Sequence, residues 1–104
     1  MTLGNRLAEA SIDLAGAAMT TSPDGGLTWA RRDRPFATVS ADGSNAEFGL
    51  DPAVAEAALR TPDVSPSEVG PGWVRFAPAA LDDRAIDRAV AWFASAHRRL
   101  QPRN

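Results

Sequence analysis

The side chains best suited to chemistry in this sequence are arginines and tryptophans in two short stretches. The stretch "RRDR" places Arg31, Arg32 and Arg34 around one aspartate, and the stretch "GWVRF" places Trp73 and Arg75 one residue apart. Guanidinium groups bind phosphate and carboxylate oxygens through paired hydrogen bonds. An exposed indole stacks on a planar group such as a nucleic-acid base. These five residues predict a surface that binds nucleic acid or another partner.

Both stretches also have a purely structural interpretation. In a strand, Trp73 and Arg75 share one face, and the residues between and after them share the other. The tryptophan then either lies exposed on the open face of a sheet or packs under the preceding loop, with Arg75 covering it. The run from 31 to 34 either binds an anion or forms a solvated hairpin end that discourages pairing between sheet edges. The sequence leaves these alternatives open.

Trp92 is a further large side chain with two possible roles. It comes directly before Phe93 in the last helical stretch, so the two side chains point about 100° apart. Phe93 belongs to the apolar stripe of that stretch, whereas Trp92 aligns with alanines. We expect Trp92 either to join the core or to form half of a homodimer contact.

The remaining residues predict no enzyme, no catalytic residues, no cofactor and no metal site. Cysteine is absent and His97 is the single histidine, which falls within an apolar stripe without a nucleophile signature. The carboxylates lack the spacing of a calcium loop. The glycines match neither a dinucleotide-binding loop nor a nucleoside-triphosphate loop.

Length and charge indicate one domain, residues 1–104, with a mildly acidic surface. The net charge is −2, and all 11 basic residues are arginine. Such a chain is a poor general polyanion binder, but it can carry one local basic patch. No apolar run approaches the roughly 20 residues that cross a bilayer, and the N-terminus lacks the features of a signal peptide. We therefore expect a cytoplasmic protein without a membrane partner.

The positions of apolar residues predict an α+β fold. Apolar residues recur at helical spacing near both ends of the chain, and they alternate through much of residues 27–50. The turn signal Asp42–Gly43 favours a hairpin, and Asp51–Pro52 favours the start of a helix. We predict an antiparallel sheet with helices packed on one face, in the order N-terminal helix about 3–19, three-stranded meander 27–50, helix 52–60, loop 61–72, strand 73–76, C-terminal helix 82–100. The sheet and helix core spans 27–77.

Several segments together resemble a known family. The stretch "RPFATVSADGSNAEFGLDPAVAEAAL", the proline- and glycine-rich loop, "GWVRF" and the ending "WFASAHRRL" are similar to the YjbR/MmcQ-like proteins over about residues 27–100. That resemblance implies a small α+β protein without an assigned reaction, of a kind often labelled DNA-binding. We therefore expect weak, salt-sensitive DNA binding, with protein–protein interaction or homodimer formation as the alternative.

Overall fold

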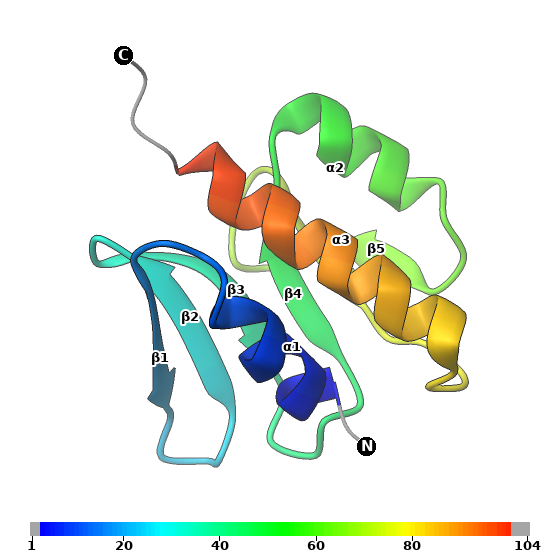
Figure 1. Ribbon diagram of the computed structural model, residues 1–104. Coiled ribbons are helices and arrows are strands. Elements are labelled where there is room, and N and C mark those ends of the chain that lie inside the picture. The colour runs from blue at the N-terminus through cyan, green and yellow to red at the C-terminus, as the bar shows by residue number, and fades with distance from the viewer. Residues whose placement is uncertain (1–2, 101–104) are drawn as a thin grey trace.

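In the described part of the chain, three helices lie over one face of a six-stranded antiparallel sheet (Figure 1). The structure is a computed structural model that describes residues 3–100. Along the sheet the strands follow the order β1-β2-β3-β4-β6-β5. This arrangement confirms the predicted α+β class with helices on one face. The elements are α1 Leu3–Ser11, β1 Ala17–Thr21, β2 Leu27–Arg31, β3 Arg34–Val39, β4 Ala46–Gly49, α2 Pro52–Leu59, β5 Val64–Pro66, β6 Trp73–Phe76 and α3 Asp83–Arg99.

The N-terminal helix is shorter than the sequence predicted. It ends at Ser11, and the following alanines enter a strand, so the expected helix over about 3–19 is wrong beyond Ser11. Gly16 has a φ of 74°, a left-handed conformation that ends a helical path without steric cost. Strand β1 then pairs with β2 along its whole length, from Ala17 opposite Arg31 to Thr21 opposite Leu27. Pairing with β2 therefore overrides the helical preference of alanine.

The sheet also has more strands than the sequence predicted. With β1 added, the meander contains four strands instead of three. The segment 61–72, expected to be a loop, contains the short strand β5. Strand β6 lies between β4 and β5 and is antiparallel to both. The last helix agrees with its prediction: it begins after Asp82, whose side chain accepts a hydrogen bond from the Ala85 amide at 2.9 Å.

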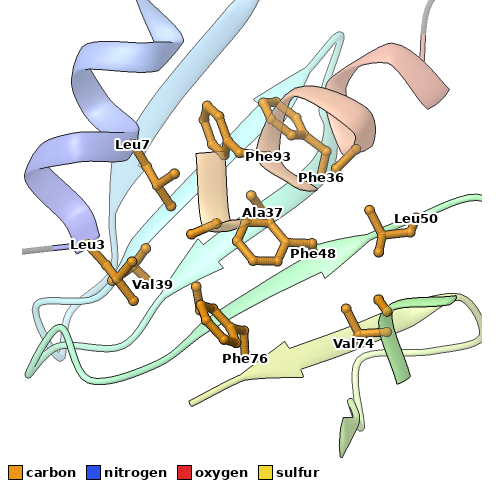
Figure 2. Packing of buried hydrophobic residues seen from close by; sticks show 14 of the residues in the cluster. Leu3, Leu7, Phe36, Ala37, Val39, Phe48, Leu50, Val74, Phe76 and Phe93 are labelled. Carbon is orange, nitrogen blue, oxygen red and sulfur yellow. The ribbon is translucent and has the colours of Figure 1, made fainter. Parts of the chain in front are cut away.

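Alternation along the strands builds the core. Figure 2 shows Val39, Phe48, Val74 and Phe76 pointing from the sheet toward the helices. Phe93 of α3 fills the space between the sheet and α1, and its ring meets Trp29 edge to face at 5.1 Å. Burial of large apolar side chains is the main favourable contribution to such a fold. The largest fully buried side chains are Trp29, Phe36, Phe48, Phe76, Phe93, Leu3, Leu7, Leu50 and Val74.

Strict alternation fails at Phe36. Trp29 pairs with Ala37 while Ala30 pairs with Pro35, so β3 carries one extra residue in a β-bulge. Phe36 and Ala37 are consequently both buried, although neighbouring strand residues normally point to opposite faces. The Phe36 ring packs at 5.3 Å from the ring of Phe93 and at 5.5 Å from that of His97. The bulge thereby places the last turn of α3 beside the β2–β3 hairpin.

Candidate functional site

The run "RRDR" forms the tight turn between β2 and β3. Arg31 ends β2 and faces Arg34 at the start of β3, and the turn residues Arg32 and Asp33 have φ values of 52° and 65°. Two positive φ values are the pattern of a type I′ turn, in which Asn-Gly is strongly preferred. Residues with side chains in this region cost on the order of 1–3 kcal/mol each. The turn therefore presents arginine at a position where glycine or asparagine would be more stable.

The C-terminal end of α3 lies next to this turn. His97 Nε2 is 2.6 Å from the carbonyl oxygen of Ala15 in the connector between α1 and β1. The neighbouring residue Gly16 packs against the Arg31 side chain, whose Cγ lies 3.6 Å from the Cβ position of that glycine. Figure 1 shows the β2–β3 turn and the end of α3 on the same side of the molecule. We call this surface the arginine end; it consists of Arg31, Arg32, Arg34, Arg98 and Arg99.

The arginine end carries a modest excess of unpaired positive charge. The two ion pairs found among residues 3–100 use other arginines, Arg6 and Arg60. The Nη1 group of Arg31 is buried and has no hydrogen-bond partner in the described chain. A buried charged donor without an acceptor is costly, so Arg31 Nη1 is an unsatisfied donor beneath this surface. One carboxylate lies within the turn itself, that of Asp33.

Trp73 borders the arginine end. It pairs with Gly49 across β4 and β6, and its indole Cε2 lies only 2.8 Å from where a Cβ of Gly49 would be. The Arg99 Nε–H donates to the carbonyl oxygen of Gly49 at 3.0 Å. The indole Cδ1 also lies 3.9 Å from the Cβ position of Gly70, so the ring is next to the preceding loop. Trp73 is nevertheless only half-buried, so part of the ring faces solvent.

Arg75 lies apart from the arginine end. It is exposed on the open face of the sheet, opposite Glu47 of β4 and Ser65 of β5. It stands two residues further along β6 than Trp73, which corresponds to about 7 Å. Two carboxylates share its surroundings, because a shallow hollow on this face is lined by Asn45, Glu47, Ser65, Pro66, Ser67, Glu68 and Arg75.

Glu47 organises the centre of this open face. Its Oε1 atom accepts a hydrogen bond from Thr38 Oγ1 at 3.2 Å, and its Oε2 atom accepts one from Ser67 Oγ. Both oxygens are therefore occupied by hydroxyl groups of neighbouring strands and loops. No ion pair between Glu47 and Arg75 forms within residues 3–100, although the two residues are directly opposite. The open face is polar and more acidic than the arginine end.

Trp92 packs against the core from α3. Its ring lies 5.1 Å from the ring of Phe76, edge to face, and 6.2 Å from that of Phe48. The side chain is half-buried and belongs to the apolar residues packed on the core cluster. A homodimer contact through Trp92 stays a prediction and would use only the part of the ring that the core leaves exposed.

His97 has a structural place in this region. Its side chain is 4% exposed, its ring packs on Phe36, and its Nε2–H donates to the Ala15 carbonyl, because a backbone carbonyl only accepts. Within residues 3–100 no group of three histidine or carboxylate side chains is arranged to hold a metal ion. The chemistry that this end of the molecule offers is hydrogen bonding to anions by guanidinium groups.

Sequence reasoning missed that Arg98 and Arg99 join the hairpin arginines. The two groups are more than sixty positions apart in the chain, and arginines in the last turn of a helix also have a local explanation, because they interact favourably with the helix dipole. The bulge at Phe36 and the bond from His97 to Ala15 bring them together. One signal was available in the sequence: the chain is acidic overall, yet arginines are grouped at the end of a strand and at the end of a helix.

Comparison with known proteins gives no assignment. No model of a known protein family matches this chain, and no curated protein matches it. In the part of the chain that the structure describes, no helix has the length and apolar character needed to cross a membrane.

Proposed function

We propose that this chain is a non-catalytic binding module that binds nucleic acid weakly through the arginine end. The observation that carries the proposal is that the β2–β3 turn and the end of α3 lie on the same side of the molecule. Together they carry five arginines, none of which forms an ion pair in the described chain. Guanidinium groups in such a cluster match the spacing and charge of phosphate oxygens. We also propose that the chain is related to the YjbR/MmcQ-like proteins, which its sequence resembles; such a relation would point to the same activity.

The geometry favours a single strand over a duplex. Trp73 is partly exposed beside Arg99, so a base can stack on the accessible part of the indole while neighbouring phosphates meet the arginines. The strained turn keeps Arg32 at the tip of the hairpin, where its side chain is exposed. We expect Arg75 to contribute little to nucleic-acid binding, because Glu47 and Glu68 line the same hollow on the open face and would repel phosphates.

Binding through this surface is weak and sensitive to salt. Three to five phosphate contacts release a matching number of counterions, so the logarithm of the association constant falls with the logarithm of salt with a slope of about −0.7 per contact for single strands. The Asp33 carboxylate within the turn lowers the affinity further. We place this activity in the cytoplasm, where nucleic acid is accessible to a small protein of this kind.

The test measures binding of a labelled single strand and a labelled duplex by fluorescence anisotropy, at about 20 mM and about 150 mM salt. Three variants are compared: a triple variant with Arg31, Arg32 and Arg34 changed to alanine, a double variant of Arg98 and Arg99, and a matched double variant of Arg84 and Arg88. The last pair is exposed at the opposite end of the same helix.

We expect binding at low salt that weakens at least about tenfold in the triple variant and in the Arg98/Arg99 variant. The Arg84/Arg88 variant removes the same charge from a different place, so it should bind like the unchanged protein. An absence of binding at low salt would overturn the proposal. If both double variants lost the same amount of affinity, the binding would depend on net charge alone and the arginine end would not be its site.

Protein–protein interaction is the second candidate function. It is favoured by exposed apolar side chains outside the arginine end, with Ile12 83% exposed, Val69 54% and Met19 48%. Trp92 offers the remainder of its ring on α3. Of these residues, Met19 lies in β1 at the edge of the sheet, where another strand could pair with the backbone.

A further inference from the structure

The two edges of the sheet differ in how they are protected. Strand β5 has three residues and contains Pro66, which cannot donate a backbone hydrogen bond. Strand β1 has five residues, "AAMTT", with no charge and no proline, and four of its side chains are exposed. Natural edge strands are usually shortened, charged, bulged or interrupted by proline, because an open edge accepts another strand. Strand β1 has none of these protections.

The outward hydrogen-bonding groups of β1 can be assigned. The Ser22 N–H donates to the Gly26 carbonyl at 2.8 Å where the β1–β2 hairpin closes. In an antiparallel pair the bonded positions alternate, so Thr20 and Ala18 bond to β2, whereas Thr21, Met19 and Ala17 turn their N–H and C=O groups outward. The Ala17 N–H agrees with this assignment, because it donates away from β2 to Leu14 at 3.2 Å. Met19 is the centre of the outward set.

The side chains of β1 are symmetric about the same residue. Two small residues stand on each side of Met19, so a two-fold axis there places alanine opposite threonine and methionine opposite methionine. No charged side chain faces its own copy, and like charges directly opposite would oppose pairing. A second copy therefore offers an uncharged strand with small residues on both sides of its central methionine.

We propose that β1 pairs antiparallel with β1 of a second copy of this chain, about a two-fold axis at Met19. Met19 exchanges both backbone hydrogen bonds with its counterpart, and Thr21 donates to the carbonyl of Ala17 in the second copy. The two sheets become continuous, and the exposed apolar part of Met19 is buried at the axis. Such self-complementary interfaces are the commonest in homo-oligomers. This inference does not rest on nucleic-acid binding.

Disulfide trapping tests the axis, because the chain contains no cysteine. The two Met19 Cα atoms of a hydrogen-bonded antiparallel pair lie about 5.5 Å apart, within the range of about 4.4–6.8 Å that a disulfide spans. We expect Met19→Cys to form a covalent dimer on mild oxidation. The control Val69→Cys has a similar exposure in the loop before β6 and should cross-link at least about tenfold more slowly.

A mixture of two variants tests the register. Ala18 and Thr20 of the second copy form a non-hydrogen-bonded pair in the proposed arrangement, with Cα atoms about 4.5 Å apart. Ala18→Cys mixed with Thr20→Cys should therefore give a heterodimer faster than either variant alone gives a homodimer. Equal rates in the mixture and in the separate variants would overturn the register about Met19.

Sedimentation measures the dimer without a cross-link. Met19→Lys places two ammonium groups at the axis, and Met19→Pro removes an outward N–H that the fold of the monomer does not use. Each change should weaken the dimer at least about tenfold, while Val69→Lys leaves it unchanged. Thermal unfolding verifies that each variant is folded.

Two outcomes would overturn the proposal. One is an unchanged protein that stays monomeric at the highest soluble concentration while Met19→Cys cross-links no faster than Val69→Cys. The other is a dimer that persists in folded Met19→Lys and Met19→Pro, because that dimer would use another surface.

Discussion

The Nε2 atom of His97 lies 2.6 Å from the carbonyl oxygen of Ala15, a residue 82 positions earlier in the chain. This contact joins the last turn of α3 to the connector between α1 and β1. The same histidine ring packs on Phe36, the extra residue of the bulge in β3. One side chain thus holds three elements together at the place where the arginine groups meet.

Removing this contact should destabilise the fold in two separable steps. His97→Phe keeps a ring on Phe36 but loses the hydrogen bond, so we expect the free energy of unfolding to fall by about 1 kcal/mol. His97→Ala also leaves a cavity and should cost about 2–4 kcal/mol. Urea unfolding measures both, with Ser95→Ala on the same helix as a control that changes little. A fully stable His97→Ala would contradict the anchoring role.

Gly49 is expected to tolerate no side chain, because of Trp73 and not because of its backbone. An alanine Cβ would lie 2.8 Å from the indole and 3.0 Å from Arg99 Nη2. Gly49→Ala should therefore lower the free energy of unfolding by about 1–3 kcal/mol and change the tryptophan emission.

Two further variants test the reason given for Gly49: one removes the indole, and the other adds a Cβ at a different glycine beside it. Trp73→Ala removes the clashing ring, so adding Gly49→Ala to it should cost much less than in the unchanged protein. Gly70→Ala meets the same indole at an ordinary 3.9 Å and should be nearly neutral. Additive effects of Gly49→Ala and Trp73→Ala would mean that the ring does not press on Gly49.

The turn at Arg32–Asp33 should lower the stability of the fold while it contributes to nucleic-acid binding. Both residues have positive φ, so replacing them by Asn-Gly relieves strain and should raise the free energy of unfolding by about 1 kcal/mol or more. The same change removes a guanidinium from the tip of the arginine end, and nucleic-acid binding at low salt should weaken. Chemical unfolding and anisotropy are measured on the same samples.

Asp33→Gly alone separates the two effects of that replacement. It relieves strain and removes a negative charge while all five arginines remain, so both stability and binding should increase. Binding that falls in this single variant would show that the aspartate, or the turn geometry itself, contributes to the interface.

Asp42 should give the β3–β4 loop a pH-dependent stability. Hydrogen bonds from the Ser40 hydroxyl, and then from the Ser44 amide and hydroxyl, lower the pKa of Asp42 from 3.8 to about 2. Because the folded-state pKa is the lower one, the charged form stabilises the fold above about pH 4, and this contribution is lost as the pH falls toward 2. Asp42→Asn keeps an acceptor oxygen but no charge.

The difference in unfolding free energy between the unchanged protein and Asp42→Asn should therefore be present at neutral pH and disappear near pH 2. Acid titrations followed by urea unfolding at each pH measure this difference. A difference that stays constant from pH 7 to pH 2 would contradict a role for ionisation.

Local sequence determined the type of most elements. Alternation predicted the buried faces of β2 and β4, with Trp29, Ala46 and Phe48 all at 0% exposure. The helix start at Pro52 followed from the preference for Asp–Pro at the beginning of a helix, which depends on a few neighbouring residues. These features are encoded within one or two turns of chain, so periodicity and turn chemistry suffice to find them.

Tertiary structure alone decided β1, the bulge at Phe36 and the meeting of the arginines. The alanines of β1 suit a helix, and they become a strand because β2 offers an open edge along its length. The bulge lets Phe36 pack on Phe93 across the core, a contact between residues far apart in the chain. Arg31 and Arg99 come to one end through strand register and the bond from His97 to Ala15, which are long-range pairings that no local pattern records.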